Sequence, residues 1–87
     1  MKSDKISRLV TENINLIYLV MKRFRNRGVD REDLFQIGAV GLTKAAQRFD
    51  ESKALPFLTY AVPLIIGEIQ RFLRDDGMVH ISRKITG

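Results

Sequence analysis

Apolar residues recur at steps of three and four along three segments of this 87-residue chain, which restricts it to a helical fold. The row in residues 3–27 is wide enough to require burial against other helices. It consists of Ile6, Val10, Ile14, Ile17, Met21 and Phe24, flanked by Leu9, Leu16 and Val20. Three such segments in so short a chain predict an all-α fold, a compact three-helix bundle whose first helix is either continuous or split.

A cluster of basic residues at 22–27 ends this first helix and is followed by Gly28. Cations in a last turn with glycine just beyond are a helix stop signal, because they complement the helix dipole and permit a left-handed cap. The same cluster also suits contact with a phosphate backbone or with an acidic protein surface. The sequence alone leaves both interpretations open.

The second predicted helix spans residues 30–49. Asp30 suits the N-cap position, and Glu32 and Asp33 place negative charge in the first turn. One face of this helix is lined by Leu34, Gly38, Gly41, Leu42 and Ala45. Because a glycine inside a helix costs about 1 kcal/mol relative to alanine, we expect both glycines in the core, where a neighbouring helix approaches closely.

Residues 57–76 carry two helical rows at once. One row is apolar and is expected to be buried; it contains Leu58, Val62, Ile65, Ile69 and Phe72. The other row carries an aromatic ring, a glycine and two guanidinium groups; it contains Tyr60, Leu64, Gly67, Arg71 and Arg74. This second row suits contact with a flat, anionic partner.

Two prolines and a glycine set the expected ends of the third helix. Pro56 is suited to its start, and Pro63 is expected to distort its first turn. We expect the helix to end near Gly77. The folded domain would then comprise residues 1–77, and residues 78–87 would form an extended tail leading to further domains. His80 has no neighbouring ligand set and is expected to be a polar loop residue.

Composition excludes several classes of function. The chain has no cysteine, so it has no disulfide framework and no thiolate metal or redox site. No apolar run approaches the roughly 20 residues of a membrane span, and the start of the chain lacks the apolar segment of a signal peptide. We therefore expect a cytoplasmic protein that does not bind membranes.

Catalytic and cofactor chemistry are also not expected. No serine, histidine and acid are spaced as a triad, and no glycine-rich phosphate loop is present. The sequence therefore predicts a binding domain that is not an enzyme, with no metal, no cofactor and no small-molecule substrate. The net charge of +5, from 15 basic and 10 acidic residues, favours an anionic partner.

Two blocks of sequence read DLFQIGAVGLTKAAQRFD at 33–50 and FLTYA at 57–61. They resemble region 2 of bacterial sigma factors of the sigma-70 family. The continuation VPLIIGEIQRFLRDDG at 62–77 resembles the sporulation branch that acts in the forespore, and its ending is similar to the early-acting member. The resemblance covers roughly residues 6–83, and it implies a helical domain that binds core RNA polymerase and the promoter −10 element.

The resemblance implies a role for each of the two later helices. The second helix would dock on the coiled coil of the polymerase β′ subunit, through Asp33, Gln36, Ile37, Ala39, Val40 and Thr43. The third helix and the connector before it would open the −10 DNA and hold its non-template strand.

The family pattern also assigns individual DNA-binding positions. Phe49, Asp50 and Lys53 would form the pocket for a flipped adenine, and Tyr60 would stack where the strands open. Contacts near the upstream duplex edge and on phosphate are implied for Gly67, Gln70, Arg71 and Arg74, and the predicted DNA-binding set is completed by Thr59 and Leu64.

The chain departs from the family pattern at several positions. Pro63 and Leu64 stand where housekeeping members carry two tryptophans, so we expect weaker melting and a tighter dependence on promoter sequence. Leu58 replaces a small polar residue, and by its row it faces the core. Lys53-Ala54 stands where arginine and glycine are usual, which alters the expected adenine pocket.

Two other functions remain open at this stage. One is a reader of duplex DNA that inserts the third helix into the major groove without melting. The other is a protein-interaction domain bound by an anti-sigma factor, a partner that the sporulation resemblance also implies. The regions that would read the −35 element are absent from the chain, which therefore resembles an isolated domain or a fragment.

Overall fold

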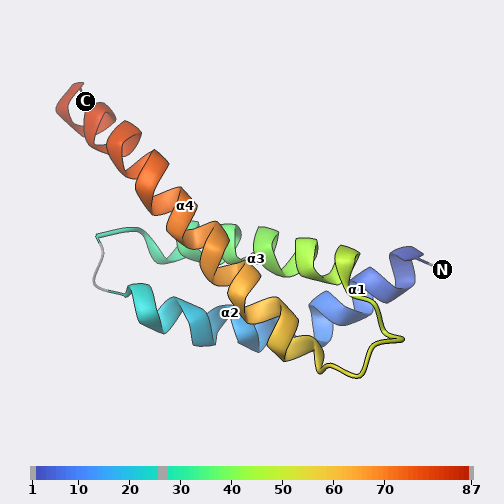
Figure 1. Cartoon of the computed structure of the whole chain (residues 1–87). Coiled ribbons are helices and arrows are strands. Elements are labelled where there is room, and N and C mark those ends of the chain that lie inside the picture. Colours follow the sequence, from blue (N-terminus) through green and yellow to red (C-terminus); the bar gives the residue numbers. More distant parts are fainter. Residues whose placement is uncertain (1, 26–27, 87) are drawn as a thin grey trace.

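The chain folds into a bundle in which the long C-terminal helix crosses the helices that precede it (Figure 1). The computed structural model describes the backbone of residues 2–25 and 28–86 and the side chains of residues 4–25 and 28–75. Every regular element of these residues is helical: α1 (Lys2–Glu12), α2 (Ile14–Met21), the short 3-10 helix η1 (Lys22–Phe24), α3 (Arg31–Arg48) and α4 (Phe57–Thr86). The prediction of an all-α bundle is confirmed, and of the two forms left open for the first helix, the split one is observed.

Asn13 divides the first helix into α1 and α2. Its backbone leaves helical geometry at φ −124° and ψ 20°. Its side-chain Nδ2 donates to the carbonyl oxygen of Leu9 at 2.8 Å, so the amide replaces a backbone donor that the helix would otherwise supply. Beyond η1, Gly28 adopts φ +75°, which agrees with the predicted stop. Asn26 and Arg27 lie outside the described residues.

Side chains of α2, α3 and α4 meet in one core. The largest fully buried side chains are Ile17, Val20, Leu34, Leu42, Ile65 and Ile69. The prediction that α3 begins after an Asp30 cap is confirmed, because Asp30 Oδ1 accepts a hydrogen bond from the backbone N–H of Glu32 at 3.4 Å. The predicted apolar rows therefore account for most of the buried surface.

The two buried glycines of α3 mark where its neighbours approach most closely. A Cβ atom at Gly38 would lie 2.7 Å from Cγ2 of Ile17 in α2. At Gly41 it would lie 2.7 Å from Cα of Ile65 and 3.0 Å from the carbonyl oxygen of Leu64, both in the backbone of α4. The expectation that close packing compensates for the helix propensity lost at these glycines is confirmed.

Leu58 does not belong to the buried row of α4, so the sequence prediction for this residue is wrong. Its side chain is 49% exposed, and Ala61, one turn later, is the first buried residue of the helix. Helical spacing gives the direction of a side chain around the helix axis. It does not indicate how far along that axis each face is covered by neighbours, and in the first turn of α4 it is Phe57 and Tyr60 that pack against the core.

The prediction for the two ends of α4 is only partly right. The helix starts at Phe57, directly after Pro56, and Thr59 N donates a hydrogen bond to Pro56 O at 3.1 Å. The first turn is regular α-helix, so the structure does not show the distortion expected there. Pro63 lies inside the helix, where it lacks the N–H that would bond the carbonyl of Thr59.

The prediction of an extended conformation for residues 78–87 is wrong for 78–86, because α4 continues to Thr86. Gly77 weakens a helix by only about 1 kcal/mol, which an established helix can absorb. The proposed division of the chain after residue 77 stays a prediction. The side chain of His80 lies outside those that the structure describes. Among the described residues, no helix has the length and apolar character to cross a membrane.

Candidate nucleic-acid interface

Three aromatic rings meet where α3 ends and α4 begins. Phe49 follows the last residue of α3 in extended geometry, and its carbonyl oxygen accepts a hydrogen bond from Lys5 Nζ of α1 at 2.6 Å. Its ring lies 5.1 Å from that of Phe57, edge to face at 77°, and 6.0 Å from that of Tyr60 at 40°. All three rings are half-buried. The structure thus brings Phe49 and Tyr60 together, as the resemblance implies.

The connector after Phe49 is held in a turn by Asp50. Its Oδ1 accepts hydrogen bonds from Ser52 Oγ at 2.6 Å and from Ser52 N at 3.0 Å. The hydroxyl of Ser52, followed by its backbone N–H, holds the pKa of the Asp50 carboxyl below its usual value. An ion pair of 2.9 Å between Arg8 and Glu51 fastens the same connector to α1. Asp50 therefore orders the turn, while Lys53 is exposed on it.

The outward row of α4 combines an aromatic ring, an open gap and two guanidinium groups. Tyr60 and Leu64 are half-buried, whereas Gly67, Arg71 and Arg74 are exposed. A Cβ atom at Gly67 would meet no heavy atom within 4 Å, so packing does not require this glycine. The gap leaves the helix backbone open to a large partner. Thr59 is also exposed, in the first turn of the helix.

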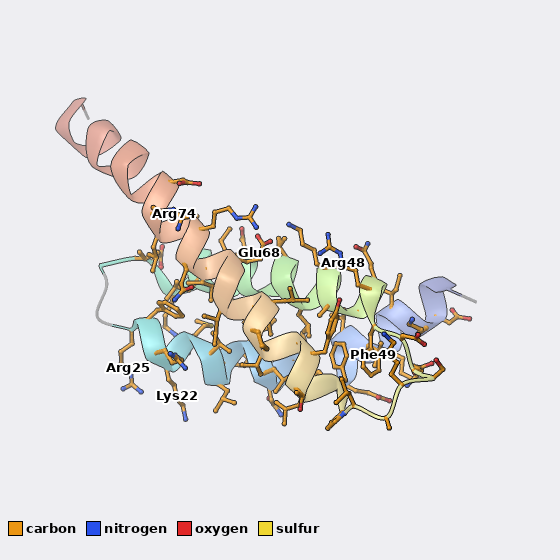
Figure 2. All side chains as sticks on the ribbon, in the orientation of Figure 1. Lys22, Arg25, Arg48, Phe49, Glu68 and Arg74 are labelled. Carbon is orange, nitrogen blue, oxygen red and sulfur yellow. The ribbon has the colours of Figure 1, made fainter. Side chains whose placement is uncertain are left out.

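A cavity of about 290 Å³ lies where α3 and α4 cross. Its α4 wall is formed by Pro63, Leu64, Gly67, Glu68 and Arg71, and its α3 wall by Lys44 and Arg48. Figure 2 shows Arg48 and Glu68 on the same side of the bundle. The sequence analysis missed the two α3 cations. Their spacing of four residues places them on one helix face, but only the crossing with α4 brings that face beside Arg71.

Gln70 and Arg74 border a different cavity, of about 300 Å³, together with Phe24 and Leu73. They lie toward η1, whereas Leu64, Gly67 and Arg71 lie toward α3. The structure therefore does not bring all the predicted DNA-binding residues into one pocket. It distributes them from the aromatic rings to Arg74, a separation of about 21 Å along the α4 axis from Tyr60.

The predicted polymerase-binding residues lie on α3. Asp33, Gln36 and Val40 are exposed, and the side chain of Val40 is 43% exposed although it is apolar. The remaining members are half-buried; they are Ile37, Ala39 and Thr43. None of the six lines the cavity between α3 and α4. The polymerase-binding set thus lies outside this cavity but beside its α3 wall, because Val40 precedes Lys44 by one helical turn.

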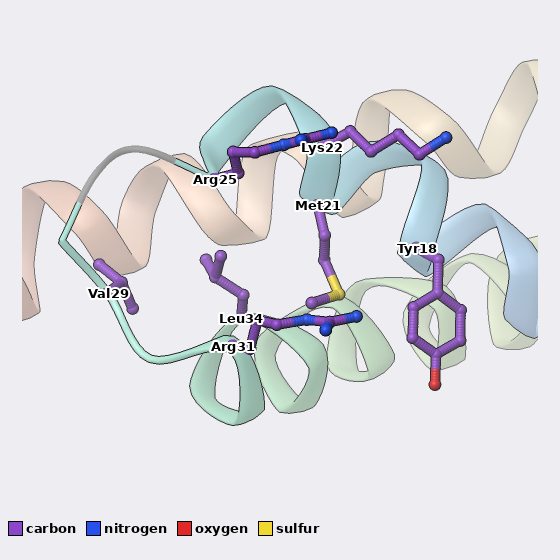
Figure 3. A pocket seen from close by; sticks show the side chains of 7 residues that line it. All are labelled: Tyr18, Met21, Lys22, Arg25, Val29, Arg31 and Leu34. Carbon is purple, nitrogen blue, oxygen red and sulfur yellow. The ribbon is translucent and has the colours of Figure 1, made fainter.

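A third cavity, of about 450 Å³, lies between the end of α2 and the start of α3 (Figure 3). Its apolar lining comes from Tyr18, Met21, Val29 and Leu34, and its cations are Lys22, Arg25 and Arg31. The Tyr18 ring also lies 5.2 Å from the ring of Phe35 in α3. This arrangement gives two members of the basic cluster at 22–27 an apolar site beside them. Among the described residues, no acidic and histidine side chains are grouped to hold a metal ion.

Comparison with known proteins gives one consistent result. Residues 9–78 match the family described as Sigma-70 region 2. The chain is 52% identical over 86 residues to the RNA polymerase sigma-F factor of Priestia megaterium, an alignment that covers 97% of this chain and 34% of that protein. It is 49% identical over 78 residues to the RNA polymerase sigma-G factor of Bacillus subtilis, with 90% of this chain and 30% of that protein covered.

A shorter relative is covered more fully. The putative RNA polymerase sigma-G factor of Bacillus thuringiensis subsp. kurstaki is 47% identical over 88 residues, which cover 98% of this chain and 70% of that protein. By contrast, the chain spans about a third of the length of the sigma-F relatives that it matches. No solved structure matches the chain.

Proposed function

Because the chain belongs to the Sigma-70 region 2 family, we propose that it binds core RNA polymerase through α3 and captures the non-template strand of a promoter −10 element through α4 and the connector. The names of its relatives, RNA polymerase sigma-F and sigma-G factors, support the same class of function. Sporulation-specific promoters and action in the forespore are the finer part of this proposal. They rest on the likeness to these two kinds of relative.

The single observation that carries the proposal is the aromatic group at the end of α3, with Tyr60 beside Phe49 and Phe57. Opening a duplex without hydrolysis requires a site that binds unstacked bases better than stacked ones. A ring such as Tyr60 contributes ~1–3 kcal/mol for each base stacked on it. This is comparable with the few kcal/mol needed to extrude a nucleotide from a duplex.

Phe49 supports Tyr60 and also borders the connector that carries Lys53. In the proposed adenine pocket, Asp50 holds the turn through its Oδ1, which accepts two hydrogen bonds from Ser52. Its second carboxylate oxygen can still accept from the amino group of a flipped adenine, beside the rings and Lys53. Ordering of the turn is thus a second role for Asp50 in the pocket that the resemblance implies.

Cations along α4 and α3 would supply the sequence-independent part of the affinity. Arg71 and Arg74 lie on the outward row of α4, and Lys44 and Arg48 extend this positive surface onto α3. Each phosphate neutralised by such a cation makes the affinity fall more steeply with salt. Gln70 has an exposed amide that can pair with an adenine edge at the upstream end.

The α3 surface suits a protein partner better than DNA. It presents the carboxylate of Asp33, the amide of Gln36 and the exposed apolar side chain of Val40. A negative charge repels phosphates, whereas an apolar side chain next to polar groups is typical of the core and rim of a protein interface. We assign this surface to the coiled coil of the polymerase β′ subunit.

The proposal is tested by titrating the chain with fluorescent non-template-strand oligonucleotides, matched or scrambled at the −10 adenine, with and without the β′ coiled coil. We expect a preference for the matched strand that appears or grows when the coiled coil is present. Tyr60→Ala should lower matched-strand affinity by roughly 5- to 150-fold, the equivalent of ~1–3 kcal/mol, whereas Tyr60→Phe should retain most of it.

Equal binding of matched and scrambled strands under both conditions would overturn the strand-capture mechanism. Equal affinity for duplex and single-stranded DNA, with little effect of Tyr60→Ala, would instead support a reader of duplex DNA. The Tyr60→Phe variant distinguishes loss of the ring from loss of the hydroxyl.

The cavity between α2 and α3 favours a second function, binding of an acidic segment of an anti-sigma factor. Lys22, Arg25 and Arg31 beside an apolar lining complement a peptide that carries carboxylates next to an apolar side chain. Arg25→Glu should weaken capture of an anti-sigma factor, whereas Arg23→Glu, an exposed neighbour that does not line the cavity, should not. Equal effects of the two variants would refute this assignment.

A further inference from the structure

One carboxylate holds two cations in the cavity between α3 and α4. Glu68 Oε2 lies 2.6 Å from Lys44 Nζ of α3 and 3.5 Å from Arg71 Nη2 of α4. The side chain of Glu68 is only 15% exposed, although it lies on the side of α4 that carries the proposed DNA-binding residues. Glu68 is therefore placed between two groups that a phosphate would otherwise bind.

Gly41 makes room for this carboxylate. A Cβ atom at Gly41 would lie 3.2 Å from Cγ of Glu68, in addition to its contacts with the backbone of α4. The glycine thus admits both the close helix crossing and the aliphatic part of the Glu68 side chain. Because this part is packed against α3, the carboxylate has a fixed position at the crossing.

The charges around the cavity determine the effect of the Glu68 carboxylate on phosphate binding. Three cations, Lys44, Arg48 and Arg71, line the cavity, and Glu68 is the one acidic residue among the residues that line it. Cations alone bind the phosphates of any strand regardless of its sequence. A carboxylate among them cancels one charge and competes with phosphate for the ammonium of Lys44.

We infer that Glu68 limits the sequence-independent part of strand capture by acting through Lys44 and Arg71. By opposing phosphate binding at the crossing, Glu68 lowers the affinity for every strand in equal measure, whatever its bases, and makes that affinity depend less on salt. This inference rests on the proposed function, since it concerns the same DNA surface.

Glu68→Gln separates this role from a structural one. The amide has nearly the same shape as the carboxylate and still accepts a hydrogen bond from Lys44. Glu12→Gln is the matched control, because Glu12 carries the same charge, is 61% exposed in α1 and lies 3.9 Å from Arg8, away from the cavity. Thermal unfolding of both variants verifies that each chain is folded before binding is measured.

The experiment measures the affinity of the full chain for matched and scrambled single strands over a range of salt concentrations. At about 50 mM salt, Glu68→Gln should bind the scrambled strand roughly fivefold more tightly, and the slope of log affinity against log salt should steepen by about 0.7, the value for one added phosphate contact. The matched strand should gain by the same factor, so that the preference for it stays unchanged. Glu12→Gln should change neither the affinities nor the slope.

A second variant tests whether Lys44 is the group that Glu68 restrains. Lys44→Gln should remove most of the gain in the Glu68→Gln background, and should cost more affinity there than in the wild-type chain. Unchanged affinity and slope in Glu68→Gln, or equal changes in Glu12→Gln, would overturn the inference while the wild-type strand preference still stands. A wild-type chain without any strand preference would overturn both the inference and the proposed function.

Discussion

The outward faces of α3 and α4 differ in chemistry although the two helices are buried in the same way. Both bury an apolar row against the other at the crossing beside Gly41. On the outside, α3 presents Asp33, Gln36 and Val40, whereas α4 presents Tyr60, Gly67 and Arg71. The buried rows decide the fold, and the exposed rows decide which partner each helix suits.

The two faces adjoin where α3 and α4 cross, because Val40 lies one helical turn before Lys44, which lines the cavity there. A change at the crossing should therefore affect both faces, and a change on one face should affect that face more than the other. The following predictions test this division, from the largest expected effect to the smallest.

Gly41→Leu should have the largest effect, because it removes the arrangement on which both faces depend. Its Cβ alone would lie 2.7 Å from Cα of Ile65, a backbone atom that can move only if α4 moves. Overpacking of this kind costs about 1–3 kcal/mol, and we expect a value near 3 because backbone must shift. Urea denaturation followed by circular dichroism measures the loss. Unchanged stability would show that α3 and α4 do not pack as described.

The sequence predicted the parts of this architecture that depend on local pattern. The start of α3 at Asp30, the stop at Gly28 and the burial of Gly38 and Gly41 all follow from signals within a few residues. Leu58 was misplaced because its exposure depends on which faces of the first turn of α4 are covered by neighbours. The same limit applies to the candidate site.

Within the candidate site, the resemblance gave residue roles but not their neighbours. Lys44 and Arg48 were missed because only the crossing of two helices brings them beside Arg71, which lies more than twenty residues further along the chain. The hydrogen bonds that Ser52 donates to the Asp50 carboxylate were likewise not predicted, although both residues lie in one short connector. Helical spacing is a property of one segment, and these contacts join several.

Val40→Glu should impair binding at the α3 face more than binding at the α4 face. If Val40 is covered by polymerase, the new carboxylate is desolvated there, and the affinity for core RNA polymerase should fall by about tenfold, or 1.4 kcal/mol. Binding of the matched single strand should fall by less, because the new carboxylate lies one helical turn from Lys44, outside the cavity. Competition against labelled wild-type chain measures the first affinity, and fluorescence anisotropy measures the second.

The matched control for this variant is Leu19→Glu. Leu19 is an apolar side chain in α2 that is 54% exposed, close to the 43% of Val40, and it belongs to neither proposed face. It should tolerate the charge without loss of polymerase binding. Equal losses in the two variants would mean that added negative charge, and not the position of Val40, weakens the complex.

Gly67→Ala should have the smallest effect of the three. It should raise the stability of the fold slightly and lower the affinity for DNA. No heavy atom lies within 4 Å of the position a Cβ would take, and Gly67 lies inside a helix, so alanine should stabilise the chain by about 0.5–1 kcal/mol. Gly41→Leu has the opposite effect on stability, since the atoms added at Gly41 meet the backbone of α4.

If the gap at Gly67 admits DNA, the methyl group of alanine should weaken binding to strands with an intact upstream duplex edge while leaving short single strands unaffected. Thermal unfolding and titrations with the two kinds of DNA separate these effects; a variant that is more stable and binds both equally well would show that this glycine is not used by the DNA face.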